Sequence, residues 1–218
     1  MARYILVTVL SSALLSPLSA HAETTFGAGV GTLGFNVTLG QSLTENINLR
    51  LSYNSADYDF DGETDGVNYD YGFDLSSFSA QIDWHPLRNG FRLSAGAISN
   101  GNKINAASKA FEGTVEIGDQ NFTNEQVGRL EGDIKFDSIA PYLGLGWGRA
   151  ADQGWGFLFD LGVAFQGSGD ANLTAVDGSF SDNPLLIAEI EREELELEAD
   201  IEDYDLYPVA SFQLMYAF

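Results

Sequence analysis

The sequence predicts an all-β protein, an eight-stranded antiparallel β-barrel that spans a membrane. Three observations lead to this fold class. Large apolar residues alternate with small or polar ones over segments of about 10 residues, which is the pattern of a membrane-spanning strand. The connections between these segments are alternately short and long. Nothing after residue 22 approaches the run of roughly 18 apolar residues that indicates a membrane-spanning helix.

The composition excludes several classes of protein. The 218 residues suffice for one domain or two, and 32 acidic residues against 10 basic ones give a formal charge of −22. A nucleic-acid partner is excluded because no surplus of cations could neutralise the phosphates. The absence of cysteine excludes disulfides, thiol nucleophiles and cysteine-ligated metals. With 12% aromatic residues, the chain also differs from a disordered acidic tail.

Residues 1–22 have the organisation of a signal peptide. Arg3 supplies a positive charge, an apolar stretch follows at residues 4–15, and the segment ends in Ser-Ala-His-Ala at residues 19–22. Cleavage there would leave residues 23–218 as the barrel. The alternative, a signal anchor, is disfavoured because about 12 apolar residues do not cross a bilayer core that needs about 20. We therefore expect an exported protein.

The strands follow from the alternation, in chain order. Residues 25–30 form the first strand, and Gly-Thr-Leu-Gly at residues 31–34 reverses the chain into the second. The positions between the large residues are mostly glycine, alanine and isolated polar groups, whereas a soluble β-sandwich would carry charges evenly along its solvent face. We therefore expect the large residues to face lipid and the others to face the barrel interior. The predicted outward residues of strands two to seven are Phe35, Val37 and Leu39; Leu49, Leu51 and Tyr53; Phe78, Ala80, Ile82 and Trp84; Phe91, Leu93 and Ala95; Ile139, Leu143, Leu145 and Trp147; and Trp155, Phe157, Phe159, Leu161, Val163 and Phe165.

The eighth strand ends the chain. It alternates through residues 211–218 and stops at an aromatic carboxyl terminus. Aromatic residues near the ends of such segments are typical of barrels of the outer-membrane type. We expect outer-membrane lipid around the barrel, and the barrel-assembly machinery as a partner of this strand. Its outward residues are Phe212, Leu214, Tyr216 and Phe218.

The polar connections predict the orientation in the membrane. The short ones fall at residues 41–46, 85–90 and 148–154, and the long ones at residues 56–74, 100–133 and 167–205. Outer-membrane barrels have short periplasmic turns and long extracellular loops, so we expect both termini in the periplasm. The three long loops hold 26 of the 32 acidic residues, and a solvated surface is the ordinary explanation of such charge.

Three segments carry a resemblance to a known family. Residues 91–96 (FRLSAG), 139–146 (IAPYLGLG) and 207–209 (YPV) resemble those of CarO-type outer-membrane proteins. The resemblance implies an eight-stranded barrel in the outer membrane of a Gram-negative cell. It also implies a link to the uptake of ornithine and other basic amino acids and to carbapenem susceptibility. It assigns no substrate-binding residue in this sequence.

One acidic segment has the spacing of a metal site. Asp57, Asp59 and Asp61 precede Gly62 in the pattern D-x-D-x-D-G, which lets carboxylates converge on a hard cation around a glycine turn, and Asp65 falls at the ninth position. The segment lies between strands rather than helices, so an EF-hand is not indicated. The open alternatives are a Ca²⁺ or Mg²⁺ loop site and a solvated acidic loop without a cofactor.

Four charged residues are predicted inside the barrel. Strand parity directs Arg50, Asp83, Arg92 and Asp160 into the lumen, which in an eight-stranded barrel is only just wide enough for side chains to fill. Unpaired charges there would be unfavourable, so we expect a network of ion pairs. This lumen charge network is either a structural plug or part of a polar pathway for a small solute.

Residues 184–203 are ambiguous between helix and strand. Asn183 and Pro184 suit the cap and first position of a helix, although leucines and acids alternate further along. We expect a short helix in the last loop. Its acidic residues, expected on a solvated surface, are Glu189, Glu191, Glu193, Glu194, Glu196 and Glu198.

Catalysis has no support in the sequence. After cleavage His85 would be the only histidine, and it lies in a predicted periplasmic turn without a recognisable serine or acid partner. Two classes of function remain. One is porin-like uptake of small, preferentially cationic solutes, which acidic loops would concentrate at the barrel mouth. The alternative is a non-conducting barrel that acts structurally or through surface interactions, because a fold does not by itself define a function.

Overall fold

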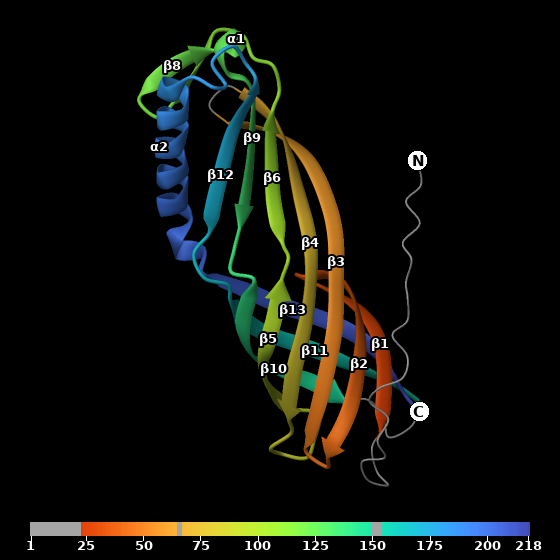
Figure 1. Cartoon of the computed structure of the whole chain (residues 1–218). Coiled ribbons are helices and arrows are strands. Elements are labelled where there is room, and N and C mark those ends of the chain that lie inside the picture. Colours follow the sequence, from red (N-terminus) through yellow and green to blue (C-terminus); the bar gives the residue numbers. More distant parts are fainter. Residues whose placement is uncertain (1–22, 65–66, 150–153) are drawn as a thin grey trace.

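The computed structural model describes residues 23–64, 67–149 and 154–218, and the predicted signal peptide at residues 1–22 lies outside them. In the described part of the chain, eight antiparallel strands form a closed ring (Figure 1). They are β1 (Thr24–Gly31), β2 (Gly34–Thr44), β3 (Ile47–Thr64), β4 (Val67–Trp84), β5 (Arg92–Asn100), β10 (Ile139–Arg149), β11 (Gly154–Phe165) and β13 (Leu206–Ala217). The predicted eight-stranded barrel is confirmed.

The ring closes where the first and last strands meet. Ala28 of β1 lies opposite Val37 of β2 on one side and Leu214 of β13 on the other. Closure leaves no unpaired strand edge within the barrel, as the hydrocarbon of a bilayer requires. The predicted tight turn between β1 and β2 is also present: Gly31 pairs with Gly34, whose φ of +98° favours glycine.

The outer face of the barrel is apolar, as the alternation predicted. Phe35 is 72% exposed and Trp155 is 68% exposed, values expected for side chains that contact lipid rather than a protein core. The C-terminal residues also face outward, with exposures between 37% at Tyr216 and 73% at Phe218. The ring of Tyr216 lies 5.1 Å from Trp155 and 5.2 Å from Phe218, in an aromatic cluster beside the short turns. Such clusters mark the interfacial girdle of a membrane barrel.

Beyond the barrel, β3 and β4 continue as a long hairpin and a sheet forms on it. β4 pairs with β6 (Lys103–Ser108), β6 with β9 (Gly128–Lys135), and β9 with β12 (Asp170–Asp177). We call residues 56–64 of β3, residues 67–75 of β4, and strands β6, β9 and β12 the protruding sheet. Figure 1 shows it rising from one end of the barrel.

The protruding sheet corrects one prediction. Residues 56–74, 100–133 and 167–205 were expected to be loops, but much of each segment is regular secondary structure. Where the β3–β4 hairpin leaves the ring, β4 has an unpaired edge. β6 pairs with this edge, β9 pairs with β6, and β12 pairs with β9. The alternation of aromatic and acidic residues at 57–63 is the sequence signal for this extension.

The remaining elements pack against the protruding sheet. They are β7 (Thr114–Ile117), β8 (Gln120–Thr123), α1 (Asn124–Val127), α2 (Pro184–Ile201) and the 3₁₀ helix η1 (Glu202–Tyr204). The predicted helix is confirmed and is longer than expected: the Asn183 side chain accepts a hydrogen bond from the Leu185 N–H, and Pro184 opens the first turn. None of the helices in the described ranges is long and apolar enough to cross a membrane.

Cysteine labelling tests the orientation. The chain lacks cysteine, so single replacements give a clean background. Glu63→Cys and Glu196→Cys lie exposed at the protruding end and should react with an impermeant maleimide on intact cells. The matched variant Asn89→Cys, exposed in a short turn at the other end, should react only after the outer membrane is permeabilised. Labelling of Asn89→Cys alone on intact cells would reverse the orientation.

Candidate functional site: the barrel lumen and the protruding sheet

The structure brings the four predicted lumen charges together. Arg50 lies on β3, Asp83 on β4, Arg92 on β5 and Asp160 on β11, and all four side chains are at most 4% exposed. Each occupies an inward position of its strand, flanked by residues that face lipid. Side chains from distant parts of the sequence therefore meet across the lumen.

Two cations and two anions balance within this network. The Asp160 carboxylate accepts hydrogen bonds from Arg50 Nη1 at 2.7 Å and from Arg92 Nη2 at 2.6 Å. Asp83 Oδ2 lies 3.0 Å from Arg50 Nε. Such geometry is what makes buried charges tolerable, because an unpaired ion in this interior would lose its hydration without compensation.

Neutral groups complete the network. Gln81 Oε1 accepts a hydrogen bond from Arg50 Nη2 at 2.7 Å, the Ser94 hydroxyl donates to Asp83 Oδ1 at 2.6 Å, and the Ser211 hydroxyl donates to Asp160 Oδ2 at 3.3 Å. These three residues were not predicted as members of the network, although the inward parity of their strands was a signal for each. The contacts link five of the eight ring strands and hold opposite walls of the barrel together.

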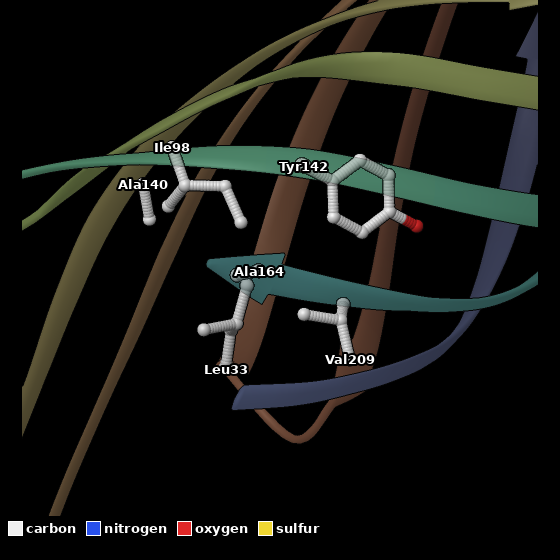
Figure 2. Close-up of a cluster of buried hydrophobic side chains, with 6 residues drawn as sticks. All are labelled: Leu33, Ile98, Ala140, Tyr142, Ala164 and Val209. Atoms are coloured by element: carbon white, nitrogen blue, oxygen red, sulfur yellow. The ribbon is translucent and has the colours of Figure 1, made fainter. Parts of the chain in front are cut away.

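A second, apolar layer closes the lumen towards the protruding sheet. Figure 2 shows its members, which converge from the β1–β2 turn and from strands β5, β10, β11 and β13. Ile98 and Val209 continue the inward alternation of their strands, whereas Leu33 reaches inward from a turn that no periodicity marks. The layer consists of Leu33, Ile98, Ala140, Tyr142, Ala164 and Val209.

Glycines make room for the largest lumen side chains. A Cβ on Gly144 would lie 2.2 Å from the Tyr142 hydroxyl, and one on Gly162 would lie 2.5 Å from it. A Cβ on Gly146 would lie 2.7 Å from Cζ of Arg92. The small residues on the inner wall of β10 and β11 are thus required by packing, because a narrow barrel has no other space for a tyrosine and an arginine.

Little space remains between the two layers. The cavity there measures about 20 Å³, and Arg50, Tyr142, Asp160 and Gln213 are among the residues that line it. This volume is sufficient for about one water molecule. The part of the chain that the structure describes thus places a buried ion-pair network and an apolar layer across the lumen, with this small cavity between them.

The acidic residues of α2 required a correction. They were expected on a solvated surface, but four of the six bind backbone N–H groups. Glu194 Oε1 accepts from Leu173 N at 2.6 Å and Glu198 Oε1 from Ala171 N at 3.2 Å. In the same way, Glu189 and Glu193 accept from Asp119 N and Gly118 N, both at 3.0 Å. Of the six, only Glu191 and Glu196 are exposed to solvent without a bond to a backbone N–H.

The bonds to Ala171 and Leu173 have a clear structural role. Both residues lie on β12, which is the outermost strand of the protruding sheet. An edge strand presents backbone N–H groups that no neighbouring strand accepts. The two carboxylates of α2 supply acceptors in place of a strand, so the helix caps this edge of the sheet.

The prediction that Asp57, Asp59 and Asp61 converge on a metal ion is wrong. Asp57, Asp59 and Asp61 lie along the extended strand β3 rather than around a glycine turn, and Asp65 lies outside the described residues. Neighbouring side chains on one face of a strand are held apart rather than brought to a point. Within the described ranges, no group of three acidic or histidine side chains could hold a metal ion. Calcium binding itself stays a prediction.

Asp61 already has a cationic partner. Lys109 Nζ lies 2.6 Å from its carboxylate and 2.7 Å from that of Asp70. The hydrogen bond from Lys109 lowers the pKa of Asp61, and the bonds to Asp61 and Asp70 raise the pKa of Lys109 to about 12. An ammonium group thus occupies the position beside Asp61 where a metal ion was predicted.

Comparison with known proteins supports the fold. No protein-family model and no curated protein matches the chain. Among solved structures, Acinetobacter baumannii CarO2 is 22% identical, with a TM-score of 0.59 over 90% of this chain and 98% of that one. Acinetobacter baumannii CarO is 21% identical, with a TM-score of 0.57 over 89% and 97%. The chain therefore has the fold of these outer-membrane barrels, and its apolar outer face is that of an integral outer-membrane protein.

The ion-pair network should be essential for stability. Asp160→Ala would leave Arg50 and Arg92 without their shared anion, so we expect the free energy of unfolding to fall by about 3 to 5 kcal/mol. Guanidinium unfolding in lipid vesicles, followed by tryptophan fluorescence, measures this loss. The matched exposed variant Asp59→Ala should change the free energy by less than about 0.5 kcal/mol. Equal losses in the two variants would contradict a stabilising network.

A double-mutant cycle tests the role of Gly144. Gly144→Ala should destabilise the barrel by about 1 to 3 kcal/mol, because the new methyl group overlaps the Tyr142 ring. In a Tyr142→Leu background the same change should cost much less, since the Tyr142 hydroxyl and Cζ are absent and only the Leu161 carbonyl oxygen, 3.0 Å from the new Cβ, remains close. The same unfolding assay gives both values. An additive cycle would show that Gly144 is required for another reason.

Proposed function

We propose that this protein is a non-conducting outer-membrane barrel that holds the protruding sheet at the cell surface as an interaction surface. One observation carries the proposal: a neutral ion-pair network and an apolar layer lie across the lumen, with a cavity of about 20 Å³ between them. Passage of a solute would require both layers to separate. The outer face of the barrel contacts lipid, whereas the protruding sheet lies outside the membrane and is accessible to other molecules, so we place the function there.

The proposal includes the surroundings of the barrel. Outer-membrane lipid contacts its apolar face, and the barrel-assembly machinery recognises the C-terminal strand. The outward row of β13 supports this partner, because it presents an apolar and aromatic strand face. No nucleic acid is a partner, since the net charge of −22 repels one.

Uptake of small cationic solutes is the second candidate. It is favoured by the charge at the mouth: residues 56–74, 100–133 and 167–205 contain 26 acidic side chains against four basic ones. Such a surplus raises the local concentration of cations such as ornithine. The resemblance of the strand segments to CarO-type proteins points in the same direction. In this candidate, the lumen network would act as a gate.

Reconstitution distinguishes the two candidates. We expect planar bilayers that contain the purified protein to show no channel currents above the bare bilayer, because ion pairs and apolar side chains fill the lumen. A general-diffusion porin reconstituted in the same way is the positive control. In parallel, liposomes should admit ornithine no faster than empty ones. Faster entry of ornithine than of glutamate, with a ratio that falls as salt rises, would overturn the closed barrel and establish cation uptake.

A further inference from the structure

The two edges of the protruding sheet differ. The edge at β12 is capped by Glu194 and Glu198 of α2. The opposite edge is β3, which pairs with β2 only as far as Ser55; beyond that point, no described residue pairs with its outer side. Figure 1 shows α2 beside β12 at one side of the sheet and β3 at the other. Residues 56–64 are therefore an open edge strand, with backbone groups available for hydrogen bonding.

Acidic and aromatic side chains alternate along this open edge. Asp57, Asp59, Asp61 and Glu63 lie on one face, and Tyr58 and Phe60 lie on the other. Tyr58 is 66% exposed and Phe60 is 41% exposed, so both rings are accessible to a partner. The open edge thus has an acidic face along residues 57–63 and two aromatic rings, at residues 58 and 60, on the opposite face.

The aromatic face extends onto β4. Phe60 lies opposite Tyr71 with ring centroids 5.1 Å apart, and Tyr58 lies opposite Phe73. Further across the sheet, the same face is covered by α2 and the β7–β8 hairpin, whose apolar side chains pack on Leu173 and Ala175 of β12. Only the end of the face near β3 lacks such a cover among the described elements.

Charge restricts what can occupy the edge. Asp57, Asp59 and Glu63 have no basic partner among the described residues, and residues 56–75 contain no lysine or arginine. A second copy paired antiparallel along β3 with like residues opposite one another would place aspartates opposite aspartates, which is destabilising. A basic strand would reverse the sign of that cross-strand interaction. Lys109 already shows that an ammonium group is accommodated on this face, through Asp61.

We propose that residues 56–64 bind an extended peptide segment in which basic and apolar residues alternate, by addition of a strand to the β3 edge. The peptide backbone would bond to the open edge, its lysine or arginine side chains would face Asp57 and Asp59, and its apolar side chains would pack on Tyr58 and Phe60. The inference rests on the proposed function in that the edge must be at the cell surface. It does not depend on whether the barrel conducts.

Peptide binding to the full chain in zwitterionic lipid nanodiscs tests the proposal. The probe is a fluorescent peptide of alternating lysine and valine, measured by anisotropy, with empty nanodiscs as background. We expect it to bind more tightly than a peptide with the same lysines and valines in two separate blocks. A peptide of alternating glutamate and valine should not bind. Equal affinity of the alternating and block peptides would overturn the proposal, because net charge alone would then explain binding.

Two variants locate the site and its mode of binding. Asp57→Lys/Asp59→Lys should bind the lysine peptide about tenfold more weakly, a loss of about 1.4 kcal/mol, and should gain binding to the glutamate peptide. The matched variant Glu191→Gln/Glu196→Gln, which removes exposed acids of α2, should leave the affinity unchanged. Unchanged affinity of the Asp57→Lys/Asp59→Lys variant would overturn the site.

Peptide N-methylation tests strand addition itself. Methyl groups on all lysine amides or on all valine amides block one side of the peptide strand at a time. One of the two methylated peptides should lose binding and the other should keep it, and the bound peptide should slow hydrogen exchange in residues 56–64. Equal behaviour of the two peptides, or unchanged exchange, would contradict strand addition. Channel currents would overturn the closed barrel without altering any of these results, so the two proposals fail separately.

Discussion

Every strand that faces lipid must have its backbone hydrogen bonds satisfied within the protein. The pairing of β1 with β13, which closes the eight-stranded ring, meets this requirement. The rest of the structure depends on it. A ring of eight strands has an interior only wide enough for side chains, so inward residues must fill it without leaving charge unpaired. Arg50, Arg92, Asp83 and Asp160 do so as a neutral group, and Gly144 provides the space that Tyr142 occupies.

Because the polar side chains in the lumen bind one another, the groups that are accessible to a partner lie at the end of the barrel, on the protruding sheet. There β3 and β4 extend beyond the ring. Their outer residues are not paired by ring closure, so the protruding sheet has two edges. The two edges are treated differently. Glu194 and Glu198 cap β12, whereas the β3 edge remains open between an acidic and an aromatic face. Such an edge is a risk of self-association, and the row of aspartates opposes pairing between identical copies.

The acidic residues therefore have several separate roles, which the net charge of the chain does not distinguish. Glu189 and Glu194 accept backbone hydrogen bonds and stabilise the protruding sheet. Asp160 neutralises arginines inside the barrel. Asp57 and Asp59 lie on the open edge without a basic neighbour among the described residues. Of these three kinds, only the last lies on an open strand edge, and this is why the proposed interaction is placed at β3 rather than on α2.

The sequence by itself determined the properties that follow from local periodicity. Alternation fixed which residues of each barrel strand face lipid and which face the lumen, because side chains of a strand alternate whatever the strand pairs with. It thus predicted the position of Arg50, and Asn183 and Pro184 predicted the start of α2. Only the tertiary structure decided that Asp57 lies in a strand rather than a metal-binding turn, and that Leu33 reaches into the lumen. The reason is physical: the local pattern around Asp57 is compatible with both a strand and a turn, and the outcome depends on partners far away in the chain, such as β4, β6 and the opposite barrel wall.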